Sequence, residues 1–150
     1  MRSLLVAFVA AAVILATGCG ESNRLSADAY RAKLHAINGE VGKAEGNAET
    51  TIVKARSVDE IVRALAQVAR AHDRIGDEVA ALKPPKNADA ANDLFVRGSH
   101  DLASEIRAVL PRLSSLKSPR QAQAYLGRLG DAKGGKELDR AIAEWKQNGY

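Results

Sequence analysis

The stretch from Gly130 to Glu137, which reads GDAKGGKE, has residue types and a spacing that could bind phosphate. A phosphate-binding loop needs glycine amides around the phosphates, a lysine, and then a serine or threonine that holds magnesium. Here Lys136 is followed by Glu137, whose carboxylate would repel phosphate. The preceding residues, Tyr125 to Leu129, follow a helical pattern rather than the strand that such a loop requires. We interpret the stretch as a flexible break between helical segments and expect no nucleotide site.

Ser99-His100-Asp101 contains the three residue types of a nucleophilic triad. Consecutive residues on a helix point about 100° apart, so these three side chains cannot face one another. We expect a solvated stretch without a catalytic role. Because no other arrangement of residues predicts catalysis, we expect that the protein is not an enzyme.

The three histidines lack the neighbouring residues that a metal or haem site requires. His35, His72 and His100 have no histidine or carboxylate at position i+4, and the chain has neither Glu-x-x-His nor Cys-x-x-Cys-His. We therefore predict no metal and no cofactor. His72 lies on an apolar stripe and is interpreted as a core or boundary residue with one hydrogen bond.

Cys19 follows a segment that is typical of exported proteins. Arg2 precedes an uncharged run from Leu4 to Ala16, which as a helix would span about 20 Å, less than the bilayer core of about 30 Å. A positive start, a short apolar run and small residues before a cleavage site indicate a secretory signal. Residues 1–18 are predicted to be a cleaved signal peptide.

The ending Leu15-Ala16-Thr17-Gly18-Cys19 resembles the lipobox of bacterial lipoproteins. The resemblance implies that Cys19 receives a diacylglyceryl thioether, becomes the new N-terminus and anchors the protein in membrane lipid at the extracytoplasmic face. It departs from the commonest pattern, because Ala16 stands where leucine is usual. An ordinary signal peptide remains an alternative, because Ala16-Thr17-Gly18 also satisfies the small-x-small rule. Residues 19–26 are predicted to be the lipidated cysteine and a polar tether.

Length and charge suit a single helical domain over residues 27–150. The chain has 150 residues, with 22 basic and 18 acidic side chains that alternate along it. A nucleic-acid binder usually gathers its basic residues on one face, so no nucleic-acid partner is expected. The single cysteine excludes an internal disulfide.

Apolar residues at helical spacing predict two helices in the first half of the mature chain. Ser26 can cap a helix that runs to about Arg56, with an apolar face that begins at Tyr30. Ser57 and Glu60 have the capping-box spacing and begin a second helix. This helix has the most regular apolar stripe, and Pro84 and Pro85 end it.

Two further helices are predicted in the second half. The third carries a stripe from Ala91 to Leu113, and Pro111 is expected to end or kink it near Leu110. Ser118-Pro119 begins the fourth, which we expect to be interrupted around Gly130 and broken near Gly134-Gly135. No segment alternates with period two, so no sheet is predicted.

Four amphipathic segments joined by short turns predict an all-α, antiparallel up-down four-helix bundle. Gly42 and Gly46 are spaced to allow close approach of two helices. In this topology the tether, the Lys83 to Lys86 turn and Lys146 share the membrane-proximal end.

The whole pattern resembles the small, alanine-rich helical lipoproteins of high-GC Gram-positive bacteria, some of which carry a turn like Leu82-Lys83-Pro84-Pro85. The resemblance implies a location in the cell envelope and a class of protein, but it implies no activity. Our leading hypothesis is a non-enzymatic envelope protein that engages another envelope component. The alternative is a lipoprotein that binds a small ligand or metal between helices, with His72 as a candidate contact.

Overall fold

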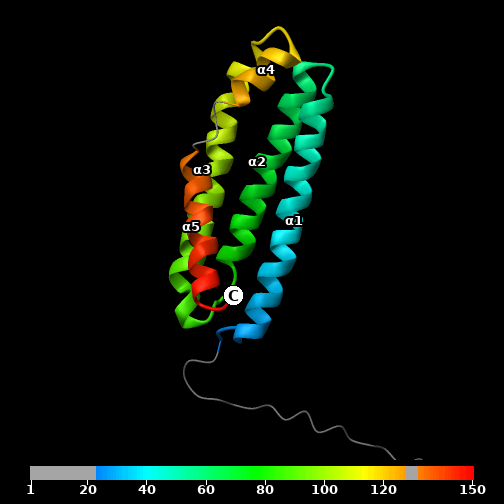
Figure 1. Ribbon diagram of the computed structural model, residues 1–150. Coiled ribbons are helices and arrows are strands. Elements are labelled where there is room, and N and C mark those ends of the chain that lie inside the picture. The colour runs from blue at the N-terminus through cyan, green and yellow to red at the C-terminus, as the bar shows by residue number, and fades with distance from the viewer. Residues whose placement is uncertain (1–22, 128–131) are drawn as a thin grey trace, which may run out of the picture.

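The computed structural model describes residues 23–127 and 132–150, and all regular structure in these two ranges is helical. Three long helices lie side by side, with consecutive helices running in opposite directions, and two shorter helices follow (Figure 1). The helices are α1 (Ala27–Lys54), α2 (Val58–Ala80), the short 3-10 helix η1 (Lys86–Ala88), α3 (Asp89–Ser114), α4 (Pro119–Leu126) and α5 (Lys133–Gln147). The predicted all-α class is confirmed.

Three helices begin at serines that were predicted as caps. The hydroxyl oxygen of Ser26 accepts from the amide of Ala29 at 3.2 Å, and those of Ser57 and Ser118 accept from amides three residues on at 3.3 Å. Each serine therefore satisfies one amide that the first turn leaves without a partner.

Prolines act differently at the two ends of α3. Pro84 and Pro85 follow α2, as expected, because proline cannot donate the next helical hydrogen bond. Pro111 does not end the helix near Leu110, since α3 continues to Ser114. Leu113 is fully buried against Ile61 and Ala122, and this burial favours continued helix in the last turn.

The fourth helix is broken, as expected, because α4 ends at Leu126 and α5 begins at Lys133, but Gly134-Gly135 lie inside α5 rather than at the break. Gly127, which follows α4, is not helical, and residues 128–131 lie outside the described ranges. Gly134 and Gly135 both belong to the first turn of α5. A Cβ at Gly134 would lie 2.7 Å from the carbonyl oxygen of Gly98 and would overlap the backbone of Leu102. Glycine is therefore needed at 134 because α5 packs directly against the α3 backbone.

Gly42 and Gly46 do not mediate close packing. Both are exposed on α1, and a Cβ at either position would meet no atom within 4 Å. The expectation of a close approach at these glycines is therefore wrong. α1 packs against α2, and the buried positions Ile37 and Ala48 belong to clusters that include α2 residues.

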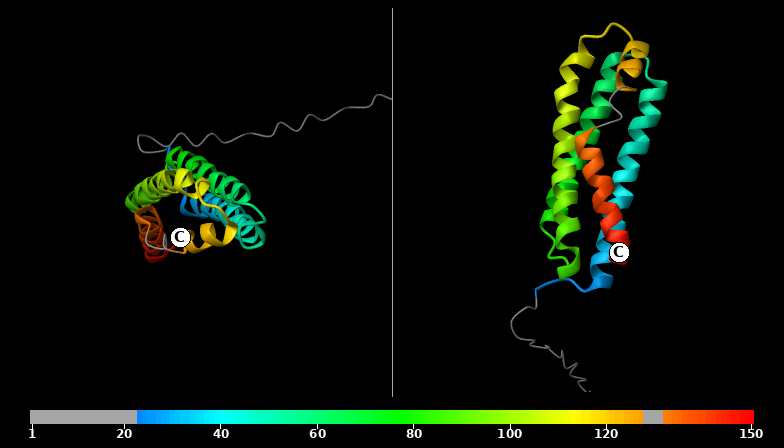
Figure 2. Two further views of the ribbon diagram at one scale, coloured as in Figure 1. Left: turned by 90° about the horizontal axis from the view of Figure 1, so that it is seen from above. Right: turned by 60° about the vertical axis from the view of Figure 1, so that its left-hand side comes forward.

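The largest cluster of buried apolar residues, which includes Tyr30, Val79, Phe95 and Trp145, lies at the end of the molecule that carries the C-terminus, and we call this end the basal half. There α5 runs beside α3 (Figure 2). The ring of Trp145 lies between those of Tyr30 and Phe95. The ring centroids of Phe95 and Trp145 are 4.9 Å apart, and those of Tyr30 and Trp145 are 6.3 Å apart in an edge-on arrangement. At the other end, the distal half, α4 covers the tips of α2 and α3 through Ala122.

Candidate functional site

Cys19, the one site residue proposed from the sequence, lies outside the described residues. The described chain begins at Asn23, and the next two residues are fixed to the basal end. Arg24 donates to the carbonyl oxygen of Pro84 at 2.8 Å and to the carboxylate of Asp89 at 2.6 Å. The amide of Leu25 donates to the carbonyl oxygen of Lys83 at 2.8 Å. Part of the predicted tether is therefore bound to the domain.

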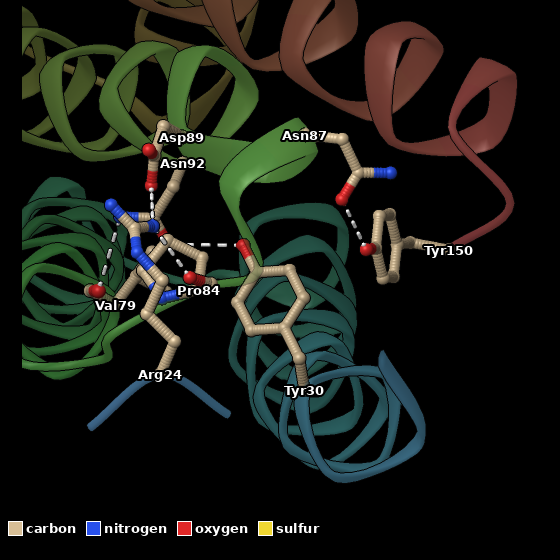
Figure 3. Close-up of polar contacts among 8 residues, drawn as sticks. All are labelled: Arg24, Tyr30, Val79, Pro84, Asn87, Asp89, Asn92 and Tyr150. Atoms are coloured by element: carbon tan, nitrogen blue, oxygen red, sulfur yellow. Dashed lines mark hydrogen bonds and ion pairs between the residues drawn. The ribbon is translucent and has the colours of Figure 1, made fainter. Parts of the chain in front are cut away.

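Further polar contacts lie close to Arg24 at the basal end, and they involve Tyr30, Asn92 and Tyr150 (Figure 3). The hydroxyl of Tyr30, which is fully buried, donates to Asn92 at 3.0 Å, and the Asn92 amide donates to the carbonyl oxygen of Val79 at 3.4 Å. Near the C-terminus Tyr150 donates to Asn87 at 2.8 Å. The N-terminal segment, the turn before α3 and the C-terminus thus share one end, as the sequence predicted.

The contacts at the basal end shift the pKa values of Asp89 and Tyr30. The hydrogen bond from Arg24 lowers the pKa of Asp89, since it favours the charged carboxylate. Burial raises the pKa of the Tyr30 phenol, because the charged form would lose its hydration. Both groups belong to the contacts that hold the basal end together.

The three side chains of Ser99-His100-Asp101 point in different directions and have different neighbours. Ser99 is fully buried, so the expectation of a solvated stretch is wrong for this residue, which faces the packed side of α3. The ring nitrogens of His100 lie 3.6 Å from Asp73 and 3.5 Å from Asp77, on α2. The carboxylate of Asp101 accepts from Lys133 at 2.8 Å.

His72 is buried at the interface of α1 and α2. Its Nε2 lies 3.2 Å from the Glu45 carboxylate, and its Nδ1 has no partner among the described residues. The prediction of a core histidine with one hydrogen bond is confirmed. In the part of the chain that the structure describes, no three histidine, cysteine or acidic side chains are grouped so that they could hold a metal ion.

The N-terminus of α5, where a phosphate-binding loop would act, receives a carboxylate from its own chain. Glu105 of α3 accepts from the amides of Lys133 at 3.1 Å and Gly134 at 3.3 Å. A helix N-terminus attracts anions, and Glu105 fills that role here. Asp101 raises the pKa of Lys133 by hydrogen bonding and charge, which adds a second link between α3 and α5.

The distal half contains an apolar groove of about 800 Å³. It lies between α1, α2 and α3, and Leu126 of α4 and Ala132, just before α5, also line it. Its floor and walls are formed by aliphatic side chains, chiefly Ala48, Ile52, Val53, Leu65, Val68, Leu102, Ile106, Ala108 and Val109. Val53 is 70% exposed, in contrast to the covered aliphatic residues of the basal half. This groove is the candidate binding site.

Among the described residues that line the groove, the charged ones are all acidic. Glu45 is held by His72, and Glu105 caps α5, as described above. Glu49 is exposed and makes no hydrogen bond or ion pair with the described residues. The groove therefore combines an aliphatic interior with a free carboxylate at its edge.

The sequence did not predict the groove, because a bundle of four amphipathic helices was expected to be closed. Ile52, Leu65, Leu102 and Ile106 lie in the three segments that were predicted as the first three helices, and each of them lines the groove. The structure accounts for the groove by helix length, since α5 has 15 residues and α3 has 26. A helix rises 1.5 Å per residue, so α5 is little more than half as long as α3.

The comparisons with known proteins identify no relative. No protein-family model matches the chain, and neither a curated protein nor a solved structure does. Among the described helices, none has the length and apolar character needed to cross a membrane.

Proposed function

We propose that the protein is a lipid-anchored component of the bacterial cell envelope that acts by binding rather than by catalysis. In this proposal residues 1–18 are a cleaved signal peptide, Cys19 carries the acyl chains, and the domain lies at the extracytoplasmic face of the cell membrane. We also propose to regard the fold as an antiparallel up-down four-helix bundle whose fourth rod is divided into α4 and α5.

The observation that carries the proposal is the attachment of Arg24 and Leu25 to the basal end. Five residue steps separate Cys19 from Arg24, and an extended chain spans at most about 18 Å over that distance. An acylated Cys19 would therefore hold the basal end close to the bilayer. The distal half, with its groove, would point away from the membrane.

The basal end would then face lipid headgroups. Lys83 and Lys86 belong to the turn that Leu25 and Arg24 contact, and Lys146 lies in the last turn of α5. Each lysine near an anionic surface contributes up to about 1 kcal/mol of attraction. This contact would fix the orientation in which the groove is presented.

The groove supports a binding role for the distal half. A surface of this kind suits either the apolar face of another envelope component or a small apolar molecule. The leading hypothesis from the sequence is a protein that engages another envelope component. The volume of about 800 Å³ is the specific observation that favours the second, since ligand sites commonly measure about 300 to 1,000 Å³.

The anchor is tested by intact-mass analysis of the protein extracted from membranes of its own host. The expected mass corresponds to a chain that begins at Cys19 and carries acyl groups, and Cys19→Ser should move the protein out of the membrane fraction. An unacylated chain beginning at residue 19 would overturn the anchor. Membrane retention of the Cys19→Ser protein would show that something other than the thioether holds it.

A further inference from the structure

We propose that the distal groove binds a flexible aliphatic molecule that ends in a cationic group, of the alkylammonium class. This inference goes beyond the anchor and does not depend on it, because it uses only the residues that line the groove. Three features of those residues carry it.

The interior selects an aliphatic body. None of the described residues that line the groove is aromatic, so a flat ring would find no stacking partner there. None of their side chains donates a hydrogen bond, so a polar group placed inside would lose its hydration without compensation. Contact with Ile52, Val68 and Ile106 favours a flexible hydrocarbon chain.

The edge selects a positive end. No lysine or arginine is among the described residues that line the groove, whereas three glutamates are. Glu45 and Glu105 already have partners within the chain, which leaves Glu49 as the carboxylate able to pair with a ligand. The described charged residues at this edge would repel an anionic headgroup such as a carboxylate or phosphate.

The length of the groove favours a small molecule over a partner helix. From Glu45 to Val53 the α1 wall extends for about 12 Å, little more than two helical turns. Leu126 and Ala132 lie at the border with α4 and α5. A longer helix laid in the groove would have to pass these two elements, whereas a single alkyl chain would not.

The test uses the mature chain from residue 19 with Cys19→Ser, after cooperative thermal unfolding has shown that it is folded. Dodecyltrimethylammonium, dodecyl maltoside and dodecyl sulfate are titrated separately, each well below its micelle concentration, and methyl NMR signals are followed. We expect saturable shifts for Ile52, Val68 and Ile106 and none for Ile37 and Ile75 of the basal core. We expect the ammonium to bind about tenfold more tightly than the sulfate at low salt.

Two variants locate the selectivity. Glu49→Lys should weaken binding of the ammonium about tenfold, whereas the matched charge reversal Asp93→Lys, at an exposed position of α3 in the basal half, should leave it unchanged. Ile106→Trp fills the groove and should abolish binding of all three probes. Equal affinity for the three headgroups would overturn the cationic class, and shifts confined to basal methyls, or no shifts, would overturn the site. Both results leave the mass test of the anchor untouched.

Discussion

The basal and distal halves are built on the same three helices, yet one is closed and the other is grooved. In the basal half α5 lies along α3 and leaves Trp145 only 7% exposed between rings from α1 and α3. In the distal half the short α4 covers the helix tips, and the aliphatic faces of α1, α2 and α3 border a groove of about 800 Å³. The difference lies in α4 and α5, since α1, α2 and α3 run through both halves.

The comparison teaches that an apolar stripe does not reveal whether it is covered. Ile52 belongs to the same helix face as Tyr30, but Tyr30 is fully buried and Ile52 lines the groove. The groove also differs in its side chains: Tyr30, Phe95, Trp145 and Tyr150 gather in the basal half, where α5 completes the packing, whereas no aromatic side chain is among the described residues that line the groove.

The largest effect is expected from truncating the closed core. Trp145→Ala should lower the free energy of unfolding by about 3 to 5 kcal/mol, because it removes a buried ring and leaves a cavity. Ile106→Ala, its counterpart in the groove, should cost only about 1 kcal/mol, since Ile106 is partly exposed there. Urea denaturation measures both. Equal losses would contradict the distinction between the halves.

The next effect concerns the contact that closes the basal half. Gly134→Ala should destabilise the protein by about 2 to 3 kcal/mol, because its Cβ would overlap the α3 backbone, which cannot rotate away. Gly135→Ala is the control, since a Cβ there meets nothing within 4 Å, and it should stabilise α5 by up to about 1 kcal/mol. Thermal unfolding of the two variants should therefore shift in opposite directions. A harmless Gly134→Ala would mean that α5 does not pack as closely as described.

Features set by neighbouring residues were predictable from the sequence. The helix caps were predictable because each serine accepts a hydrogen bond from an amide only three residues further along the chain. This holds for Ser26, Ser57 and Ser118. The all-α class and the proline stop after α2 were predictable for the same reason. Periodicity also placed His72 in the core, where it is found.

Features set by the register between helices were not predictable. Asp73 belongs to α2 but pairs with Arg107 on α3, and this contact depends on how the two helices are aligned. Gly134 was taken for a helix breaker because its role depends on an α3 backbone that is distant in sequence. The groove depends on where the fourth segment breaks, and no property of the stripe residues records that position.

The smallest effect is a dependence on pH that is confined to the basal end. Since Arg24 lowers the folded pKa of Asp89, the contribution of this pair to stability is present above the unfolded value of 3.8. It is lost as the pH falls below 3.8 and through the folded pKa. Acid should therefore release Arg24 and Leu25 from the turn before α3, and Asp89→Asn should release them at neutral pH.

Amide exchange, corrected for its intrinsic pH dependence, measures this release. Protection of the Leu25 amide, which donates to Lys83, should fall on acidification in the native protein and be low at every pH in Asp89→Asn. The Gln121 amide, bound to the Ser118 hydroxyl in the distal half, is the reference, because that hydroxyl does not titrate in this range. Parallel loss at both amides would mean that acid unfolds the whole domain. Loss at Leu25 alone would show that the basal contacts loosen the N-terminal segment independently, so that low pH would lengthen the free chain between Cys19 and the domain.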